Sequence, residues 1–199
     1  MKLIDVLFQI KKLDLLFFTT ADAAASLGVT PLAASTLLKR LNEAKHLLHL
    51  RRGLWGFADH PNPLLLPQYL TAPFPSYISL QTALYHHGML SQMSAMTFAV
   101  SLARTRLFET PLGSVSIHHL SPEFFFGFET LEDGVQMATP EKALIDILYL
   151  APAKSGLFKS LPEIEIPKKF SRQKAKEIIR KIHSARRCKM VSMLLEKLL

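Results

Sequence analysis

Short hydroxyl side chains and longer cations follow one another along residues 30–52. The hydroxyls belong to Thr30, Ser35 and Thr36, and the cations are Lys39, Arg40, Arg51 and Arg52. A hydroxyl can hydrogen-bond a base edge or a phosphate, whereas a Lys or Arg side chain brings a full charge to phosphate oxygens. The chemistry that this set of side chains offers is therefore recognition of a nucleic acid.

Residues 31–44 predict the helix that positions most of these groups. Thr30 and Pro31 supply an N-cap and a proline at the first helical position. One stripe of the helix is apolar, at Ala34, Leu37, Leu38, Leu41 and Ala44. A recognition helix reads bases mainly through its first turns, so we expect Ser35 and Thr36 at base edges and the two cations after them at phosphates. The plainest alternative is a solvated helix face.

A shorter helix and a tight turn precede this helix. Thr20 is placed to cap a helix that runs through Leu27, and Gly28 can take the positive φ that ends it. The second helix then starts within about three residues of the first, which is typical of a helix-turn-helix.

Two alternating segments follow, at residues 46–51 and 54–58. The turn between them, at Arg52 and Gly53, predicts a β-hairpin with cations near its tip, where a wing would lie. Helix, glycine turn, second helix and basic hairpin in this order predict a winged helix-turn-helix across residues 17–57. Double-stranded DNA is the usual partner of such a unit.

The composition is that of an ordinary folded protein, with 49% hydrophobic and 20% charged residues. No apolar run approaches the roughly 20 residues of a membrane-spanning helix. Charges also interrupt the apolar N-terminus where a signal peptide needs a continuous run. Cys188 is the only cysteine, so an intramolecular disulfide is impossible. We expect a cytoplasmic protein that does not contact a membrane.

The formal net charge of +8 is unevenly distributed. Residues 1–60 hold 8 Lys and Arg against 5 Asp and Glu, residues 61–150 hold 3 against 7, and residues 151–199 hold 13 against 4. This asymmetry suggests a polyanion contacted by more than one element. In the alternative, the basic C-terminal segment is solvated or docks on the acidic middle of the chain.

A basic amphipathic helix is predicted to begin at Ser171, with Ala175, Ile178, Ile179 and Ile182 turned inward. A last helix is expected near residues 189–198. Additional phosphate or partner contacts are expected from Arg172, Lys174, Lys176, Arg180, Lys181, Arg186 and Arg187.

The whole pattern predicts an α+β protein in three parts. Residues 1–60 form the winged helix-turn-helix domain, residues 61–75 an ordered proline-rich linker, and residues 76–199 a C-terminal α+β domain. Five prolines exclude a regular helix or a central strand from the linker.

The C-terminal part alternates between helix and strand patterns. It begins with a helix at YISLQTALYHHGML, which Ser79 is placed to cap. Strand patterns then predict a small mixed or antiparallel sheet from TFAVSLARTR, GSVSIHHL and GVQMAT. The chain returns to helix at TPEKALIDILYL, where Thr139 caps, Pro140 takes the first position and Glu141 suits the first turn.

The sequence gives little support to catalysis or metal binding. The adjacent histidines at 86–87 and 118–119 point apart, whether on a helix or on a strand, so neither pair chelates by itself. HExxH, GxSxG and glycine-rich phosphate motifs are absent. We therefore expect no catalytic residue, no metal, no cofactor and no enzyme activity. The phenylalanines at 124–126 and 128 favour a core strand or its edge over a base-stacking surface.

The order of these segments resembles the AbiEi-type antitoxins of abortive-infection toxin-antitoxin systems. The resemblance rests on the N-terminal winged helix, on YISLQTALYHHGML, and on TPEKALIDILYL after a small sheet, and it spans most of the chain. It implies a transcriptional autorepressor that binds inverted repeats in its own promoter. It also implies a C-terminal domain that counters a nucleotidyltransferase-like toxin, and it leaves self-association on DNA open.

A second class of function stays open beside this one. A protein-interaction module can keep a winged-helix scaffold without specific DNA binding. RNA binding through the basic tail is a third interpretation.

Overall fold

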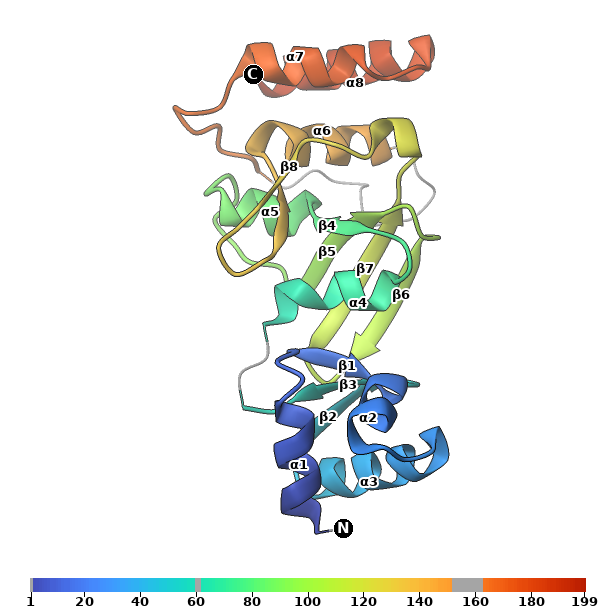
Figure 1. Ribbon diagram of the computed structural model, residues 1–199. Helices are drawn as coiled ribbons and strands as arrows, with labels where there is room; N and C mark the ends of the chain where they lie inside the picture. The colour runs from blue at the N-terminus through green and yellow to red at the C-terminus, as the bar shows by residue number, and fades with distance from the viewer. Residues whose placement is uncertain (1, 60–61, 152–162) are drawn as a thin grey trace.

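A computed structural model of the chain describes residues 2–59, 62–151 and 163–199 (Figure 1). Within these ranges the protein has eight α-helices, two short 3₁₀ helices, a three-stranded antiparallel sheet near the N-terminus and a six-stranded mixed sheet. The α+β class expected from the sequence is therefore confirmed.

The elements alternate along the chain. The helices are α1 (Leu3–Lys11), α2 (Thr20–Leu27), α3 (Pro31–Glu43), η1 (Pro63–Leu65), α4 (Leu66–Thr71), α5 (Leu80–His86), η2 (Pro122–Phe124), α6 (Pro140–Leu150), α7 (Arg172–Arg180) and α8 (Ala185–Leu198). The strands are β1 (Phe17–Thr19), β2 (Leu47–Arg51), β3 (Leu54–Phe57), β4 (Ser76–Ile78), β5 (Met96–Ser101), β6 (Arg106–Thr110), β7 (Gly113–His119), β8 (Phe128–Thr130) and β9 (Gln136–Ala138).

The N-terminal sheet has the strand order β1-β3-β2. One face packs on α1, α2 and α3 through a core that includes Phe18, Leu47 and Trp55. The other face carries Phe17 and Leu54, which belong to the core of the rest of the molecule. Because side chains alternate along a strand, the adjacent residues Phe17 and Phe18 contribute to two different cores.

The cap of α2 differs from the expectation. Thr19, not Thr20, is the N-cap, and its hydroxyl accepts a hydrogen bond from Asp22 N at 3.1 Å. The Asp22 carboxylate accepts in return from Thr19 N at 2.7 Å. This capping box gives the backbone N–H groups of Thr19 and Asp22 a hydrogen-bond acceptor each, and the helix therefore starts directly after Thr19. The Thr20 hydroxyl instead accepts a hydrogen bond from Trp55 Nε1 at 2.9 Å. The turn at Gly28, with φ of 64°, is as expected.

The six-stranded sheet has the order β6-β7-β5-β4-β9-β8. Strands β5 and β7 run parallel, as do β4 and β9, and the other pairs are antiparallel. The segment TFAVSLARTR is not one strand, because β5 ends at Ser101 and β6 begins at Arg106. Tyr77 and Ile78 end β4 and are buried in the sheet, and α5 begins at Leu80 with Ser79 at its N-cap position, as expected.

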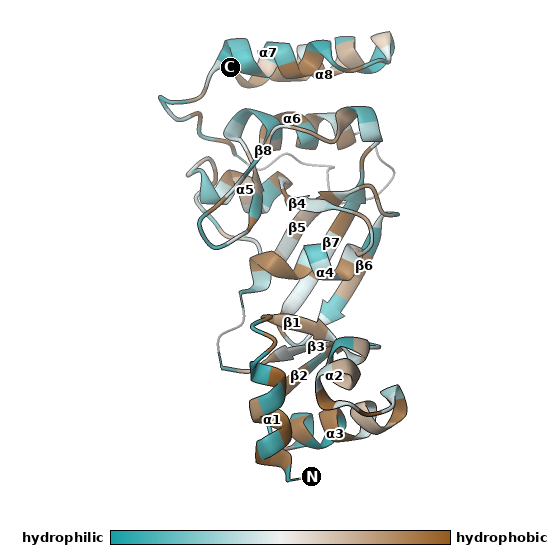
Figure 2. Ribbon diagram, in the orientation of Figure 1, coloured by the Kyte–Doolittle hydropathy of each residue, from teal (hydrophilic) through white to brown (hydrophobic). Residues whose placement is uncertain are grey.

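Helices cover this sheet in layers (Figure 1). Helix α6 packs against α5, and α7 and α8 form an outer layer on α6. Helix α7 packs through Ala175 and Ile179, and α8 through Val191 and Leu195, while charged and polar residues gather on the exposed sides of both helices (Figure 2). The last helix begins at Ala185, earlier than expected, because the hydroxyl of Ser184 caps it.

The proline-rich segment contains a helix, contrary to the expectation. Helix α4 accommodates Pro67 in its first turn, where the missing backbone N–H has no intrahelical partner to lose. Leu66 and Leu70 are buried in the main core, and the ring of Tyr69 contacts that of Phe17 edge-on at 5.2 Å. This segment therefore lies between the two sheets, in contact with both parts of the molecule.

Candidate nucleic-acid interface

Helix α3 presents one buried and one exposed side. Its inner side is formed by Ala34, Leu38 and Leu41, all fully buried against the other N-terminal elements. The helix begins as expected, because Thr30 is its N-cap and accepts a hydrogen bond from Ala33 N at 3.3 Å. This fixed inner side leaves the opposite side facing solvent.

The hydroxyls on α3 differ in what they can still bond. The side chain of Thr30 is exposed but already serves as the cap. Thr36 is exposed, and its Oγ1 donates to Leu32 O at 3.1 Å, so its oxygen keeps lone pairs for an external donor. Ser35 is half-buried. Amino groups on adenine or cytosine are donors of the kind that Thr36 can accept from.

The cations of α3 are available to a ligand. Lys39 and Arg40 are both exposed, and neither forms an ion pair with another described residue. Arg52 is exposed in the turn between β2 and β3. Since all three side chains are exposed and none forms an ion pair with a residue that the structure describes, they can reach phosphate oxygens.

Arg51 is held inside the molecule. Its Nη2 donates to Tyr69 O at 3.4 Å, and its guanidinium lies 6.0 Å from the ring centre of Phe108. The side chain is half-buried between the N-terminal sheet and the elements that follow it. We therefore leave Arg51 out of the interface, because reaching a phosphate would require it to abandon these contacts.

Leu32 is a candidate contact that the sequence pattern did not indicate. It lies in the first turn of α3 and is 81% exposed. Apolar side chains in this position can contact the methyl group of thymine in the major groove. Its place outside the apolar stripe, directly after Pro31, is the signal that could have identified it.

The basic C-terminal cations lie at the far end of the molecule from α3 (Figure 1). The helices that carry them dock by apolar contacts, and no ion pair links them to the acidic middle among the described residues. Three of the cations have partners within the chain. Arg172 donates to Leu199 O at 2.7 Å, Lys181 lies 4.3 Å from the centre of the Phe126 ring, and Arg187 lies over Tyr149. The others, all exposed, are Lys174, Lys176, Arg180 and Arg186.

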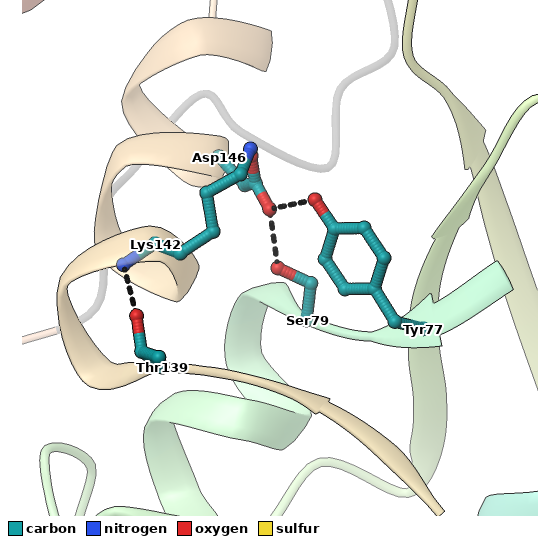
Figure 3. A network of polar contacts seen from close by, with 5 residues as sticks. All are labelled: Tyr77, Ser79, Thr139, Lys142 and Asp146. Carbon is teal, nitrogen blue, oxygen red and sulfur yellow. Dashed lines mark hydrogen bonds and ion pairs between the residues drawn. The ribbon is translucent and has the colours of Figure 1, made fainter. Parts of the chain in front are cut away.

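A second cluster of polar groups is buried beneath α6, and sequence reasoning missed it (Figure 3). Lys142 and Asp146 form an ion pair with both side chains fully buried. The Asp146 carboxylate also accepts hydrogen bonds from the Ser79 hydroxyl at 2.8 Å and the Tyr77 hydroxyl at 3.0 Å. Ser79 occupies the N-cap position of α5, but its hydroxyl bonds Asp146 instead of a backbone N–H of that helix. A Lys and an Asp four residues apart in an otherwise apolar helix were the available signal.

The cluster is buried and surrounded by aromatic rings. The Lys142 ammonium lies 3.8 Å from the centre of the Phe124 ring and 5.0 Å from that of Phe126. Burial raises the pKa of the Asp146 carboxyl and lowers the pKa of the Lys142 ammonium, and the ion pair opposes both shifts. Burial also raises the pKa of Tyr77 well above its ordinary value, with the Asp146 charge acting in the same direction. Because these groups are sealed from solvent, we interpret the cluster as structural.

The phenylalanine cluster has the buried role expected of it, but not the expected conformation. Phe124 ends the 3₁₀ helix η2, and Phe125 and Phe126 follow in a loop instead of a strand. Phe124 is buried, and Phe128 stacks on Tyr77 at 4.6 Å between ring centres. Phe124 and Phe126 line the buried ion pair, and Phe125 and Phe128 pack on Tyr77, so these rings are not arranged as an exposed stacking surface.

The remaining candidate chemistry is limited. Within the described ranges, no three His, Cys, Asp or Glu side chains come together as metal ligands would. His118 is buried and His119 exposed, as expected for neighbours on a strand. In the same ranges, no single helix is long and apolar enough to cross a membrane. The pair α2 and α3, bent by 104°, reaches that length and composition only when counted together.

The sequence of the chain has no match among protein families or curated proteins: it matches no protein-family model, and no curated protein is significantly similar to it in sequence.

Proposed function

We propose that this protein is a transcriptional regulator that binds double-stranded DNA through a winged helix-turn-helix formed by residues 17–57. The observation that carries the proposal is the exposed side of α3, where Thr36, Lys39 and Arg40 face solvent beside a fully buried inner side. The tight turn at Gly28 and the hairpin with Arg52 at its tip are the further parts that such a unit needs.

In the proposed interface, some side chains contact bases and others contact phosphates. The first turns of α3 enter the major groove, where Thr36 bonds a base edge and Leu32 contacts a thymine methyl group. Lys39, Arg40 and Arg52 bind phosphates, which fixes the position of the helix but carries no sequence information. Most of the affinity is then electrostatic and falls steeply with salt concentration.

A mobility-shift titration tests this proposal, with the DNA upstream of the protein's own gene against a scrambled duplex at several salt concentrations. We expect Lys39→Ala/Arg40→Ala to flatten the slope of log affinity against log salt by about 2, near 0.9 for each lost phosphate contact. The matched control is Lys174→Ala/Arg180→Ala, which also removes two exposed cations but from α7 at the other end of the molecule.

Two results would contradict the proposal. One is the absence of measurable binding to any duplex at low salt. The other is a Lys39→Ala/Arg40→Ala variant that binds with the affinity and salt slope of the wild type. A control variant that loses as much slope would instead add α7 to the DNA interface.

We also propose, on the resemblance to AbiEi-type antitoxins alone, that the protein represses its own promoter and counters a nucleotidyltransferase-like toxin. Its partners would be inverted repeats in that promoter and the toxin, and its compartment the cytoplasm. Co-expression with an adjacent nucleotidyltransferase-like gene tests this role through recovery of growth. If growth does not recover, the antitoxin role fails while DNA binding stands or falls separately.

Leu32 favours the rival function, a protein-interaction module. A leucine that is 81% exposed in the first turn of a helix is also a common anchor for another protein. If no duplex binds, and Leu32→Ser abolishes capture of a protein partner, the rival function is the better one.

A further inference from the structure

Helix α1 has apolar side chains on two opposite sides. Val6 and Ile10 are fully buried on the side that packs against α2 and α3. On the other side, Ile4 is 66% exposed and Phe8 is 63% exposed. Burying a side chain of this size is worth about 1.5–3 kcal/mol, so this outer side is costly to leave in water.

The exposed apolar surface extends beyond these two residues. Ile4, Leu7 and Phe8 line a shallow hollow of about 560 Å³ on α1. A second hollow, of about 250 Å³, lies past the end of the helix, where Leu15, Leu16 and Phe57 line it together with the charged residues Lys11, Asp14 and Asp59. A partner side chain as large as an aromatic ring has room here.

The charges beside this surface are arranged in a self-complementary way. Asp5 lies in the first turn of α1, and Lys12 is the C-cap residue of the helix. They are seven residues, or about two turns, apart and so lie on the same flank of the helix. The Lys12 ammonium lies 4.8 Å from the centre of the Phe8 ring, which places it at the border of the apolar surface.

We propose that the outer side of α1 binds the same surface of a second copy of this chain, with the two helices antiparallel. In this arrangement Phe8 meets Phe8 of the second copy near the centre, and Ile4 lies toward each end. Asp5 lies opposite Lys12 of the second copy, and the two-fold axis repeats that pair. A parallel two-fold arrangement would put the flanks that carry Asp5 and Lys12 on opposite sides of the dimer, where neither pair forms. The charge pattern therefore selects the antiparallel arrangement.

The dimer is a weak one. A short helix supplies far fewer than the 20–30 residues per side of a standard stable interface. We expect a dissociation constant of about 10 μM to 1 mM. The proposal does not depend on DNA binding, and its tests use the full chain without DNA, so failure of either proposal leaves the other intact.

Sedimentation equilibrium over a range of protein concentrations gives the first test. We expect the wild type to dimerise and Phe8→Glu to stay monomeric. The matched control is Met93→Glu, because Met93 is 72% exposed and lies outside α1. A wild type that stays monomeric up to about 1 mM overturns the proposal, as does a folded Phe8→Glu variant that dimerises like the wild type.

A charge exchange tests the antiparallel geometry. Asp5→Lys alone and Lys12→Asp alone should each weaken the dimer by about tenfold, because the two-fold axis counts every lost pair twice. The double variant Asp5→Lys/Lys12→Asp restores both pairs, so its dissociation constant should return to within about threefold of the wild type. If the double variant is as weak as the single ones, the antiparallel pairing is wrong.

Discussion

Helices α3 and α6 begin with the same local sequence but end in opposite environments. Each starts with Thr-Pro, and in each the threonine hydroxyl caps the first turn. Each also carries a lysine followed four residues later by an acidic residue, Lys39 and Glu43 in α3 and Lys142 and Asp146 in α6.

The tertiary surroundings decide what these charges do. Lys39 and Glu43 are exposed, and they form no ion pair. Lys142 and Asp146 are completely buried and form one. An exposed pair gains little because water solvates both charges, whereas buried charges are cut off from water and depend on partners inside the protein. The same spacing therefore marks an open surface in one helix and a structural ion pair in the other.

The largest expected effect comes from breaking the buried pair. Asp146→Ala should lower the free energy of unfolding by about 3–5 kcal/mol, because it leaves the Lys142 charge and two hydroxyls buried without their acceptor. The control Glu43→Ala should change it by less than about 0.5 kcal/mol. Urea unfolding measures both, and equal effects would contradict the contrast between the helices.

A double variant sharpens this prediction. Lys142→Met/Asp146→Leu removes both charges and replaces them with side chains of similar size. It should be more stable than Asp146→Ala, because no buried charge is left unpaired. If it is less stable than Asp146→Ala, the unpaired Lys142 charge is not what destabilises that variant.

The next largest effect concerns the buried His118, whose pKa is lowered by burial from its ordinary value of 6.5 to about 4. Below pH 6.5 the unfolded chain takes up a proton that the folded protein does not. Stability is therefore lost as the pH falls from 6.5 to about 4, by about 3 kcal/mol in total. The variant His118→Gln should not show this pH-dependent loss of stability, whereas His119→Gln, at the exposed neighbour, should still show it. Urea unfolding at several pH values tests this, and identical pH dependence in the two variants would contradict it.

The smallest effect compares the two caps. Thr30→Ala and Thr139→Ala each remove a side-chain acceptor for a backbone N–H and should cost about 1 kcal/mol. We expect the larger loss at the half-buried Thr139, where water is less able to replace the lost bond than at the exposed Thr30. Thermal unfolding of the two variants measures the difference, and a larger loss at Thr30 would show that burial does not decide it.

The N-terminal part could be predicted well because its signals are local. The cap at Thr30, the turn at Gly28 and the hairpin turn at Arg52 each depend on residues within one or two turns of the chain. The direction of Arg51 could not be predicted in the same way. Its partners, Tyr69 and Phe108, come from distant segments. A strand pattern does not say which elements will pack on the second face of the strand.

The buried cluster shows the same limit more strongly. The sequence pattern predicted α6 and its cap, but not that all of residues 141–148 would be buried. Burial on every side requires α5, α7, α8 and the sheet together. The Tyr77 hydroxyl that bonds Asp146 lies 69 residues away in the chain. The proline-rich segment was mispredicted for a related reason, since tertiary packing of Leu66 and Leu70 favours a short helix there.

By itself, the sequence determined where most helices and turns lie, which side of α3 is apolar, and the basic character of both ends of the chain. Backbone preferences, caps and periodicity act over a few residues, so one chain is enough to read them. Only the tertiary structure decided that Lys142 is buried, that Arg51 is engaged inside the molecule, and that Ile4 and Phe8 remain exposed. The environment of a side chain depends on segments far away in sequence, and no local pattern encodes which of them will cover it.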